Sequence, residues 1–178
     1  MSEAPREAIE SGVPDPFPLM HPLMQKNYGD WTWHDRPRPG VLHHVAHSGD
    51  QIWTVRAGTP RQLDVHRIRE LCDIADQYAD GHVRFTSRSN IEFMLAEEGR
   101  VAALIDELEG AGYPVGGTGN SVSQINHTQG WLHCDIPGTD GSGVAKAIMD
   151  ELIDEFRNEG MPNRVRLTTS CCQINCGG

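Results

Sequence analysis

The sequence predicts an α+β fold, because two strand–strand–helix units follow one another along residues 41–114. In the first unit, GVLHHVA and QIWTVRAG flank HSGD, a pattern typical of two strands joined by a glycine-containing turn. In the second unit, HVRFT and IEFML form another strand pair before a second helical pattern. The two units together indicate a two-layer half-domain.

The helix of the first unit is expected to begin after Asp64, whose carboxylate can cap the free N–H groups of the first turn. Apolar residues recur there at spacings of three and four, which is the repeat of one helix face. That face contains Val65, Ile68, Leu71, Cys72, Ala75 and Tyr78. We therefore expect Cys72 to be a core residue.

The helix of the second unit has an apolar stripe and a marked end. The stripe consists of Val101, Leu104, Ile105 and Leu108. Gly110 and Gly112 follow, ahead of Pro114, and glycine before proline is typical of the C-terminal end of a helix.

Residues 1–40 differ from the half-domain that follows them. They contain many prolines and the aromatic residues Tyr28, Trp31 and Trp33, without a clear period. This composition favours an extended arm packed on a neighbouring surface, since its aromatic residues argue against complete disorder. We expect the arm to contact another subunit.

A glycine-rich stretch, PVGGTGNS, marks a domain boundary at residue 115. It lacks the Lys-Ser/Thr of a phosphate-binding loop, so we reject nucleotide binding. Beyond it we expect a short strand around GWLHC, a helix from about Ser142 to Glu159, and a strand, RVRLT, that leads into cysteines. Residues 115–178 are therefore interpreted as the start of a second domain.

Charge and hydropathy exclude several classes of partner. The formal net charge is -10 and the pI about 5.3, which argues against duplex nucleic acid, because phosphate binding needs a basic face. No apolar run approaches the roughly 20 residues that span a bilayer, and the N-terminus has no signal-peptide core, so we expect a cytoplasmic protein without membrane insertion. In that reducing compartment, five cysteines favour a metal or redox site over disulfides.

Four cysteines form a Cys-x36-Cys-Cys-x3-Cys pattern: Cys134, Cys171, Cys172 and Cys176. Adjacent cysteines point in different directions along an extended backbone, which suits the corners of a bulky cluster better than one small ion. An iron–sulfur cluster accepts such varied spacing, whereas structural zinc sites usually use two local pairs. From spacing alone, a cluster, a zinc site and unrelated buried thiols all stay open.

Several longer segments resemble one protein family. RFTSRSNIEFM, CDIADQYADGH, GGTGNSVSQINHTQGWLHCDIPGTD and MPNRVRLTTSCCQINCGG are similar to the beta subunit of siroheme-dependent dissimilatory sulfite reductase. The likeness runs from about Tyr28 to the last residue, and the cysteine pattern is specific to that subunit. The resemblance implies a ferredoxin-like sulfite/nitrite reductase half-domain, followed by the start of the domain that binds siroheme and a 4Fe-4S cluster.

The resemblance also implies the cofactor ligands. Cys134, Cys171, Cys172 and Cys176 would bind the 4Fe-4S cluster, with the Cys176 thiolate shared with the siroheme iron. Many related reductases draw their first two ligands from a Cys-x5-Cys pair, whose place Cys134 and Cys171 take here.

Three residues of the RFTSR segment gain a role from the resemblance. Strand alternation places Val83 and Phe85 towards the core and Arg84, Thr86 and Arg88 on the opposite face. The matching family segment supplies cations near siroheme carboxylates and bound sulfite. Arg84 and Arg88 are therefore expected to be catalytic, and all three to contact the cofactor.

Four further residues are candidates. His127 and His133 flank the segment before Cys134, and each could donate a proton or bind a siroheme carboxylate, or be an ordinary loop histidine. Arg164 and Arg166 are weaker candidates, because only their place on the strand entering the cysteines supports them.

The resemblance implies a function and partners. The subunit would interconvert sulfite and sulfide-level sulfur by six-electron transfer, and the string NRVRLTTSCCQINCGG favours the reverse-acting branch of sulfur oxidisers. Its partners would be a homologous alpha subunit, in a heterotetramer with two copies of each subunit, and a small sulfur-carrier protein with C-terminal cysteines. Because the family continues well past the Cys-x3-Cys motif, we expect this N-terminal portion alone not to hold siroheme. The alternatives are a siroheme nitrite reductase and a non-catalytic zinc or iron–sulfur interaction module.

Overall fold

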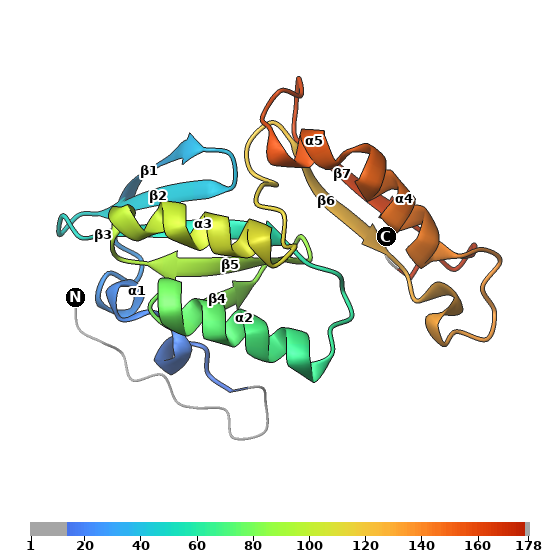
Figure 1. The fold of residues 1–178 in the computed structure, drawn as a ribbon, viewed down its shortest axis with the longest axis horizontal. Coiled ribbons are helices and arrows are strands. Elements are labelled where there is room, and N and C mark those ends of the chain that lie inside the picture. Colours follow the sequence, from blue (N-terminus) through green and yellow to red (C-terminus); the bar gives the residue numbers. More distant parts are fainter. Residues whose placement is uncertain (1–13, 177–178) are drawn as a thin grey trace.

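A five-stranded antiparallel sheet forms the larger part of the computed structural model, which describes residues 14–176 (Figure 1). Its strand order is β1-β2-β3-β5-β4. The bounds are Trp31–Arg38 for β1, Val41–Ala46 for β2, Gln51–Gly58 for β3, His82–Phe85 for β4 and Asn90–Leu95 for β5. A short helix, α1 (Pro22–Lys26), precedes β1, after a 3-10 turn at Phe17–Leu19.

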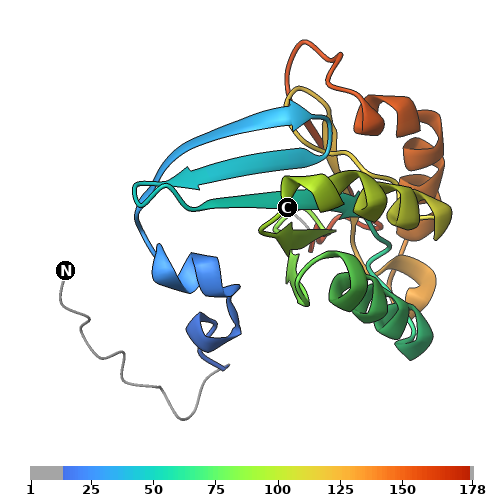
Figure 2. The ribbon, with the colours of Figure 1, turned by 60° about the vertical axis from the view of Figure 1, so that its left-hand side comes forward.

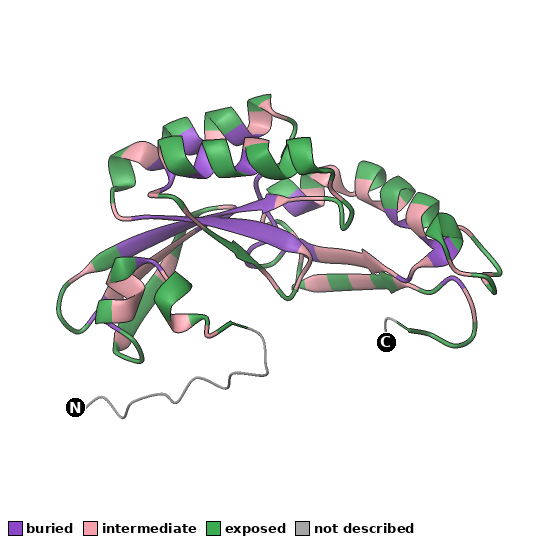
Figure 3. Cartoon of the chain, turned by 90° about the horizontal axis from the view of Figure 1, so that it is seen from below, coloured by how far each residue is buried: buried purple, intermediate pink, exposed green. Residues whose placement is uncertain are grey.

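Two helices, α2 (Val65–Tyr78) and α3 (Val101–Gly110), cover one face of this sheet (Figure 3). A one-turn 3-10 helix, Glu98–Arg100, leads into α3. The core lies between the layers, where Val55 of β3 and Phe93 of β5 pack with Leu104 and Leu108 of α3, all four fully buried. Strands β1 to β3 extend beyond the helices (Figure 2), so part of the sheet is not covered by this layer.

A smaller β–α–β unit follows. Strand β6 (Val122–His127) pairs in parallel with β7 (Val165–Thr169), and the connection contains a 3-10 turn (Gly130–Leu132) and the helices α4 (Gly141–Glu151) and α5 (Ile153–Arg157). The predicted strand around GWLHC is wrong, because that segment forms the 3-10 turn and the strand lies a few residues earlier. The single helix predicted over 142–159 is broken at Leu152, whose φ of -109° and ψ of 22° interrupt the helix.

The cap of α2 is confirmed, but its predicted buried face is only partly right. The Asp64 carboxylate accepts the Arg67 N–H at 2.8 Å, and Leu71 and Ala75 are buried together with Ile74. Val65 and Ile68 of the predicted face, however, are exposed, and so is Cys72. Cys72 lies about 100° around the helix from Leu71, at the margin of the stripe formed by Leu71, Ile74 and Ala75.

The sheet begins earlier than the sequence predicted. Residues 31–38 form β1 and pair with β2, with irregular register between Trp31 and Trp33 and between Asp35 and Arg38, so this stretch is an edge strand and not part of an extended arm. Residues 1–13 of the predicted arm lie outside the described residues. The division of the remaining chain at residue 115 stays a prediction.

The side chains of β4 point in the predicted directions, but those on the core side are less buried than predicted. Val83 and Phe85 face Phe93 and Ile91 of β5 across the strand pair, so they lie on the core side of the sheet. Because β4 is an edge strand, Phe85 remains 73% exposed.

Candidate functional site

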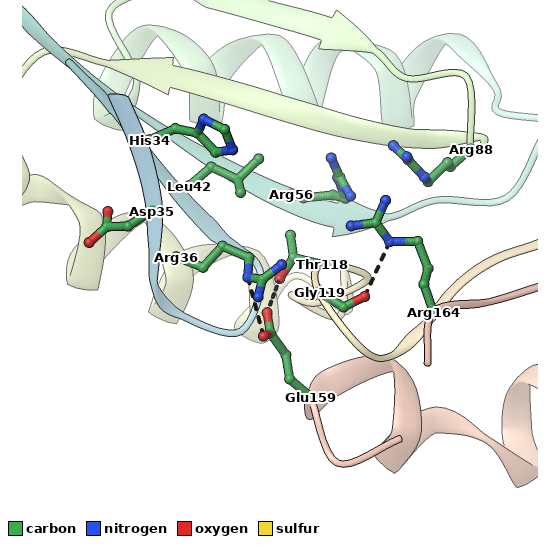
Figure 4. Close-up of a pocket in the computed structure, with 10 residues that line it drawn as sticks. All are labelled: His34, Asp35, Arg36, Leu42, Arg56, Arg88, Thr118, Gly119, Glu159 and Arg164. Carbon is green, nitrogen blue, oxygen red and sulfur yellow. Dashed lines mark hydrogen bonds and ion pairs between the residues drawn. The ribbon is translucent and has the colours of Figure 1, made fainter. Parts of the chain in front are cut away.

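A pocket of about 430 Å³ lies where the open face of the large sheet meets the smaller unit (Figure 4). Four arginines from four segments line it: Arg36 of β1, Arg56 of β3, Arg88 of the turn between β4 and β5, and Arg164 just before β7. Such a concentration of guanidinium groups in an acidic protein points to an anion as the occupant.

The sheet register fixes Arg56 against a buried carboxylate. Arg56 and Glu92 are direct partners on β3 and β5, and Glu92 has no exposed surface. Arg56 donates from Nε at 2.8 Å and from Nη2 at 2.5 Å to the same Glu92 oxygen, while its Nη1 donates to the Gly117 carbonyl at 2.7 Å. Arg56 is therefore held rigidly, with its charge already compensated.

Arg84, a predicted catalytic residue, pairs with Glu92 from the other side. It lies opposite Glu92 in the pairing of β4 with β5, and its guanidinium forms an ion pair with the second carboxylate oxygen. Burial alone would raise the pKa of Glu92, but the neighbouring Arg56 and Arg84 charges hold that pKa below its usual value. The Arg84 side chain is half exposed and does not line the pocket.

Arg88, the other predicted catalytic residue, does line the pocket and lacks a full set of partners. Its Nε is buried and has no hydrogen-bond acceptor among residues 14–176. Burial lowers the pKa of Arg88, and the positive charges of Arg56, Arg166 and Arg164 lower it further. The group nevertheless stays protonated, because a guanidinium does not lose its proton in proteins. A bound anion would satisfy both the donor and the excess charge.

Thr86 has a structural task in this arrangement. Its hydroxyl accepts the N–H groups of Arg88 at 3.2 Å and Asn90 at 3.1 Å, which fixes the turn that presents Arg88. Ser89 in the same turn has a φ of 56°. A cofactor contact by Thr86 stays a prediction.

The glycines of PVGGTGNS allow close packing between the two units. A Cβ at Gly116 would collide with the Phe156 carbonyl, and the Gly117 N–H donates to that carbonyl at 2.8 Å. Arg164 donates from Nε to the Gly119 carbonyl at 3.2 Å. The loop thus joins the pocket to α5 and to the strand that leads into the cysteines.

The most buried of the predicted cysteine ligands is Cys171, which lies two residues after the end of β7. Its N–H donates to Thr128 Oγ1 at 2.9 Å, and its carbonyl accepts the N–H groups of Gly138 and Thr139. A hydrogen bond from Thr128 lowers the pKa of the Cys171 thiol, with smaller contributions from the Gly130 N–H and Cys172. These bonds hold Gly138 and Thr139, which follow Cys134 in the same loop, against Cys171.

The four thiols are chemically suited to bind an iron–sulfur cluster, but their positions in this structure do not form a cluster site. In the part of the chain that the structure describes, no three histidine, cysteine or acidic side chains lie close enough to share a metal ion. Cys171 and Cys172 are hydrogen-bonded neighbours, while Cys176 is exposed beyond them and Cys134 lies on the facing loop. Binding a cluster would require the two loops to close together.

The two predicted histidines lie outside the pocket. His127 ends β6, where Nδ1 is 2.8 Å from the Thr128 carbonyl and 3.4 Å from Ser142 Oγ, and its own carbonyl accepts from Arg61. His133 is exposed and contacts only the Gln129 amide among the bonds described. Arg166, on β7, adds to the electrostatic field at Arg88 without lining the pocket.

Comparison with known proteins identifies the family. Residues 44–111 match the Nitrite/Sulfite reductase ferredoxin-like half domain. The dissimilatory-type sulfite reductase subunit beta of Megalodesulfovibrio gigas is 43% identical over 97% of this chain and 71% of its own length. The chain belongs to the beta subunits of dissimilatory-type sulfite reductase. The predicted family and α+β, ferredoxin-like fold class are therefore confirmed.

Other sulfite reductase relatives agree with this assignment. The beta subunits of Archaeoglobus fulgidus and Nitratidesulfovibrio vulgaris are 46% and 49% identical over 96% and 88% of the chain, which spans 49% and 43% of their lengths. The chain thus spans about half of these two relatives. An alpha subunit from Allochromatium vinosum is 22% identical over 79% of the chain and 34% of its own length.

Solved structures support the fold of this sulfite reductase chain. The crystal structure of dissimilatory sulfite reductase I superposes with a TM-score of 0.75 at 15% identity, over 83% of this chain and 37% of that one. The Mycobacterium tuberculosis NirA protein gives 0.56 at 13% identity, over 80% and 26%. Within residues 14–176, no helix is both long and apolar enough to cross a membrane.

Sequence reasoning about this sulfite reductase chain missed Arg56, Glu92, Thr118 and Glu159. Two of them had a visible signal, because Arg56 in QIWTVRAG and Glu92 in IEFML are single charges inside apolar strands. Charges at such positions are rarely fully buried unless they are paired. The other two lie in loops, and only the fold brings Thr118 and Glu159 into the pocket.

Proposed function

We propose that this chain is the sulfite-binding and cofactor-binding part of a siroheme-dependent dissimilatory sulfite reductase beta subunit. The observation that carries the proposal is the buried, unpartnered Nε of Arg88, which lies in a pocket shared with three other arginines. Sulfite and the carboxylates of siroheme are both oxyanions that guanidinium groups bind well. The family relationship supports this choice over other anions.

The cationic side chains would bind and orient the oxyanion without giving up protons. Arg88 and Arg164 can each donate to an oxygen, and both remain charged through the pH range of an enzyme reaction. Arg56 is bound by Glu92 and Gly117, so its contribution is a fixed positive field. Such preorganised charge stabilises an anion without reorganisation when it binds.

The four cysteines are proposed to hold a 4Fe-4S cluster, with the Cys176 thiolate shared with siroheme. When bound, these cofactors supply the six-electron exchange between sulfite and sulfide-level sulfur. The lowered pKa of Cys171 supports a thiolate at that position, and thiolate is the form that binds iron. Exposed Cys176 and the loop of Cys134 would move towards Cys171 on assembly.

The proposal includes partners and direction. An alpha subunit would complete the enzyme as a heterotetramer, which the alpha-subunit relative supports, and a small sulfur-carrier protein with C-terminal cysteines would exchange sulfur with it. We propose the oxidative direction in a cytoplasmic setting, where thiols such as these stay reduced.

Cofactor content after a cysteine substitution tests the proposal. The full-length beta subunit is co-produced with its alpha subunit and siroheme synthesis under anaerobic conditions, then assayed for iron, acid-labile sulfide and siroheme absorbance. Cys176→Ala is expected to remove or uncouple the siroheme, whereas Cys72→Ala, at an exposed cysteine of α2, leaves the content unchanged. Zinc without labile sulfide in the unmodified complex would refute the proposal in favour of an interaction module.

A further inference from the structure

A carboxylate occupies one side of the arginine pocket. Glu159 lines the pocket, and its Oε2 lies 3.3 Å from Nε of Arg36, while its Oε1 accepts the Thr118 hydroxyl at 2.8 Å (Figure 4). Thr118 is 2% exposed and also accepts the Gly40 N–H at 2.8 Å. The Glu159 carboxylate is therefore fixed by two donors, one of them anchored to the turn between β1 and β2.

The backbone around the carboxylate is shaped to receive it. Gly119 has a φ of 59°, and a Cβ there would collide with both carboxylate oxygens of Glu159. The Gly119 carbonyl accepts from Arg164 at 3.2 Å, so the carboxylate and this arginine lie on neighbouring groups of the same loop. A residue other than glycine at this position would force the Glu159 carboxylate to shift.

The carboxylates divide the four arginines into two pairs. Arg36 is compensated by Glu159 and Arg56 by Glu92. Arg88 and Arg164 form no ion pair within the described residues, and the Arg88 Nε has no acceptor there. An incoming oxyanion would therefore find its free donors on the Arg88–Arg164 side and meet like charge on the Arg36 side.

We infer that Glu159 limits the affinity of the pocket for oxyanions, because it fills the Arg36 side of the pocket with a protein carboxylate. The inference deepens the proposed function and rests on it. The oxyanion is sulfite or a carboxylate of siroheme, which share this chemistry. Removing the charge of Glu159 while keeping its shape should strengthen binding, whereas a purely structural role would give weaker binding.

The test compares Glu159→Gln with Glu151→Gln in the complete, siroheme-loaded complex. The glutamine oxygen can still accept from Thr118, while an uncharged amide group replaces the carboxylate oxygen that faces Arg36. Glu151 is an exposed residue of α4 outside the pocket, so it controls for the change in net charge. One arm measures the sulfite dissociation constant from the siroheme absorbance, and the other measures the rate of siroheme loss in dilute denaturant.

If sulfite occupies the pocket, we expect the Glu159→Gln complex to bind sulfite roughly three- to tenfold more tightly. If a siroheme carboxylate occupies it, we expect the variant to lose siroheme more slowly by a similar factor. Glu151→Gln should match the unmodified complex in both arms. Equal or weaker binding in Glu159→Gln would overturn the inference while leaving the proposed function intact. An unmodified complex that holds neither siroheme nor sulfite would overturn both.

Discussion

Arg88 has a buried guanidinium donor that finds no acceptor among residues 14–176. The Thr86 hydroxyl fixes the turn that carries Arg88. Burial lowers the pKa of Arg88, and the charges of three other arginines lower it further. Buried polar groups are nearly always hydrogen-bonded, so an orphaned donor in a pocket requires an explanation. A bound oxyanion supplies one, because it would accept from Nε and compensate the charge.

Substituting Arg88 should therefore weaken anion binding selectively. In the complete complex, Arg88→Ala is expected to raise the sulfite dissociation constant about tenfold or more, since hydrogen bonds to charged groups contribute about 1.5–3 kcal/mol. Titration of the siroheme spectrum with sulfite measures the effect. Arg69→Ala, which removes an exposed arginine of α2, serves as the control and should not change it. An unchanged constant in Arg88→Ala would remove Arg88 from the site.

Three adjacent strands cooperate to hold Glu92. Arg56 of β3, Glu92 of β5 and Arg84 of β4 lie in register, so a single fully buried carboxylate joins them across the open face of the sheet. Removing one member of such a buried group leaves uncompensated charge, which typically costs about 3–5 kcal/mol. Here both remaining members are cations.

Glu92→Gln should accordingly destabilise the chain at neutral pH, with a loss of about 3–5 kcal/mol in the free energy of unfolding. The pKa of Glu92 is lower in the folded state than in the unfolded chain, where it is about 4.3. The Glu92 carboxylate therefore stabilises the fold fully above about pH 4.3, and this stabilisation is lost as the pH falls through the pKa of the folded state. Urea unfolding from pH 7 down to pH 3 measures this. The stability of the unmodified chain should approach that of the variant in acid.

Glu98→Gln, at an exposed glutamate before α3, provides the matched control and should unfold like the unmodified chain at every pH. A difference between Glu92→Gln and the unmodified chain that does not shrink in acid would show that shape, and not charge, explains the loss.

The elements differ in how well their sequence predicted them. The strand pairs and the Asp64 cap follow from local signals, namely alternation, a turn glycine and a capping carboxylate, and these were right. The burial of Cys72 and Phe85 was wrong, because burial depends on which part of a helix or edge strand another layer covers. Sequence periodicity predicts which residues share one face of a helix or strand. Whether another layer covers that face depends on how the layers pack together.

At the scale of the whole molecule, the candidate site shows the same difference between what the sequence predicts and what only the packing of the elements determines. Family resemblance pointed to both Arg84 and Arg88. Arg88 lines the pocket, whereas Arg84 pairs with Glu92 and does not line it. Thr118 and Glu159 are 41 residues apart in the sequence, and only the packing of the two units makes them hydrogen-bonded neighbours. No local pattern could have indicated that pair.

The two units are held together by contacts around Phe156 of α5. Its carbonyl accepts the Gly117 N–H, its ring lies against Gly58 and Gly117, and its side chain is 2% exposed. Two ion pairs flank this contact, from Arg157 to Glu109 of α3 and from Arg36 to Glu159. Because the pocket takes arginines from both units, its shape depends on this junction.

A methyl group at Gly116 should open the junction and the pocket together. A Cβ there would overlap the Phe156 carbonyl, a backbone atom that cannot move without shifting α5, and such overpacking typically costs about 1–3 kcal/mol. We expect Gly116→Ala to increase proteolytic cleavage in the segment between β5 and β6 and to weaken sulfite binding in the complex. Gly99→Ala, where an added Cβ meets nothing within 4 Å, should change neither. If Gly116→Ala accelerated proteolysis yet bound sulfite normally, the pocket would not depend on the junction, and the sulfite contacts would lie within one unit alone.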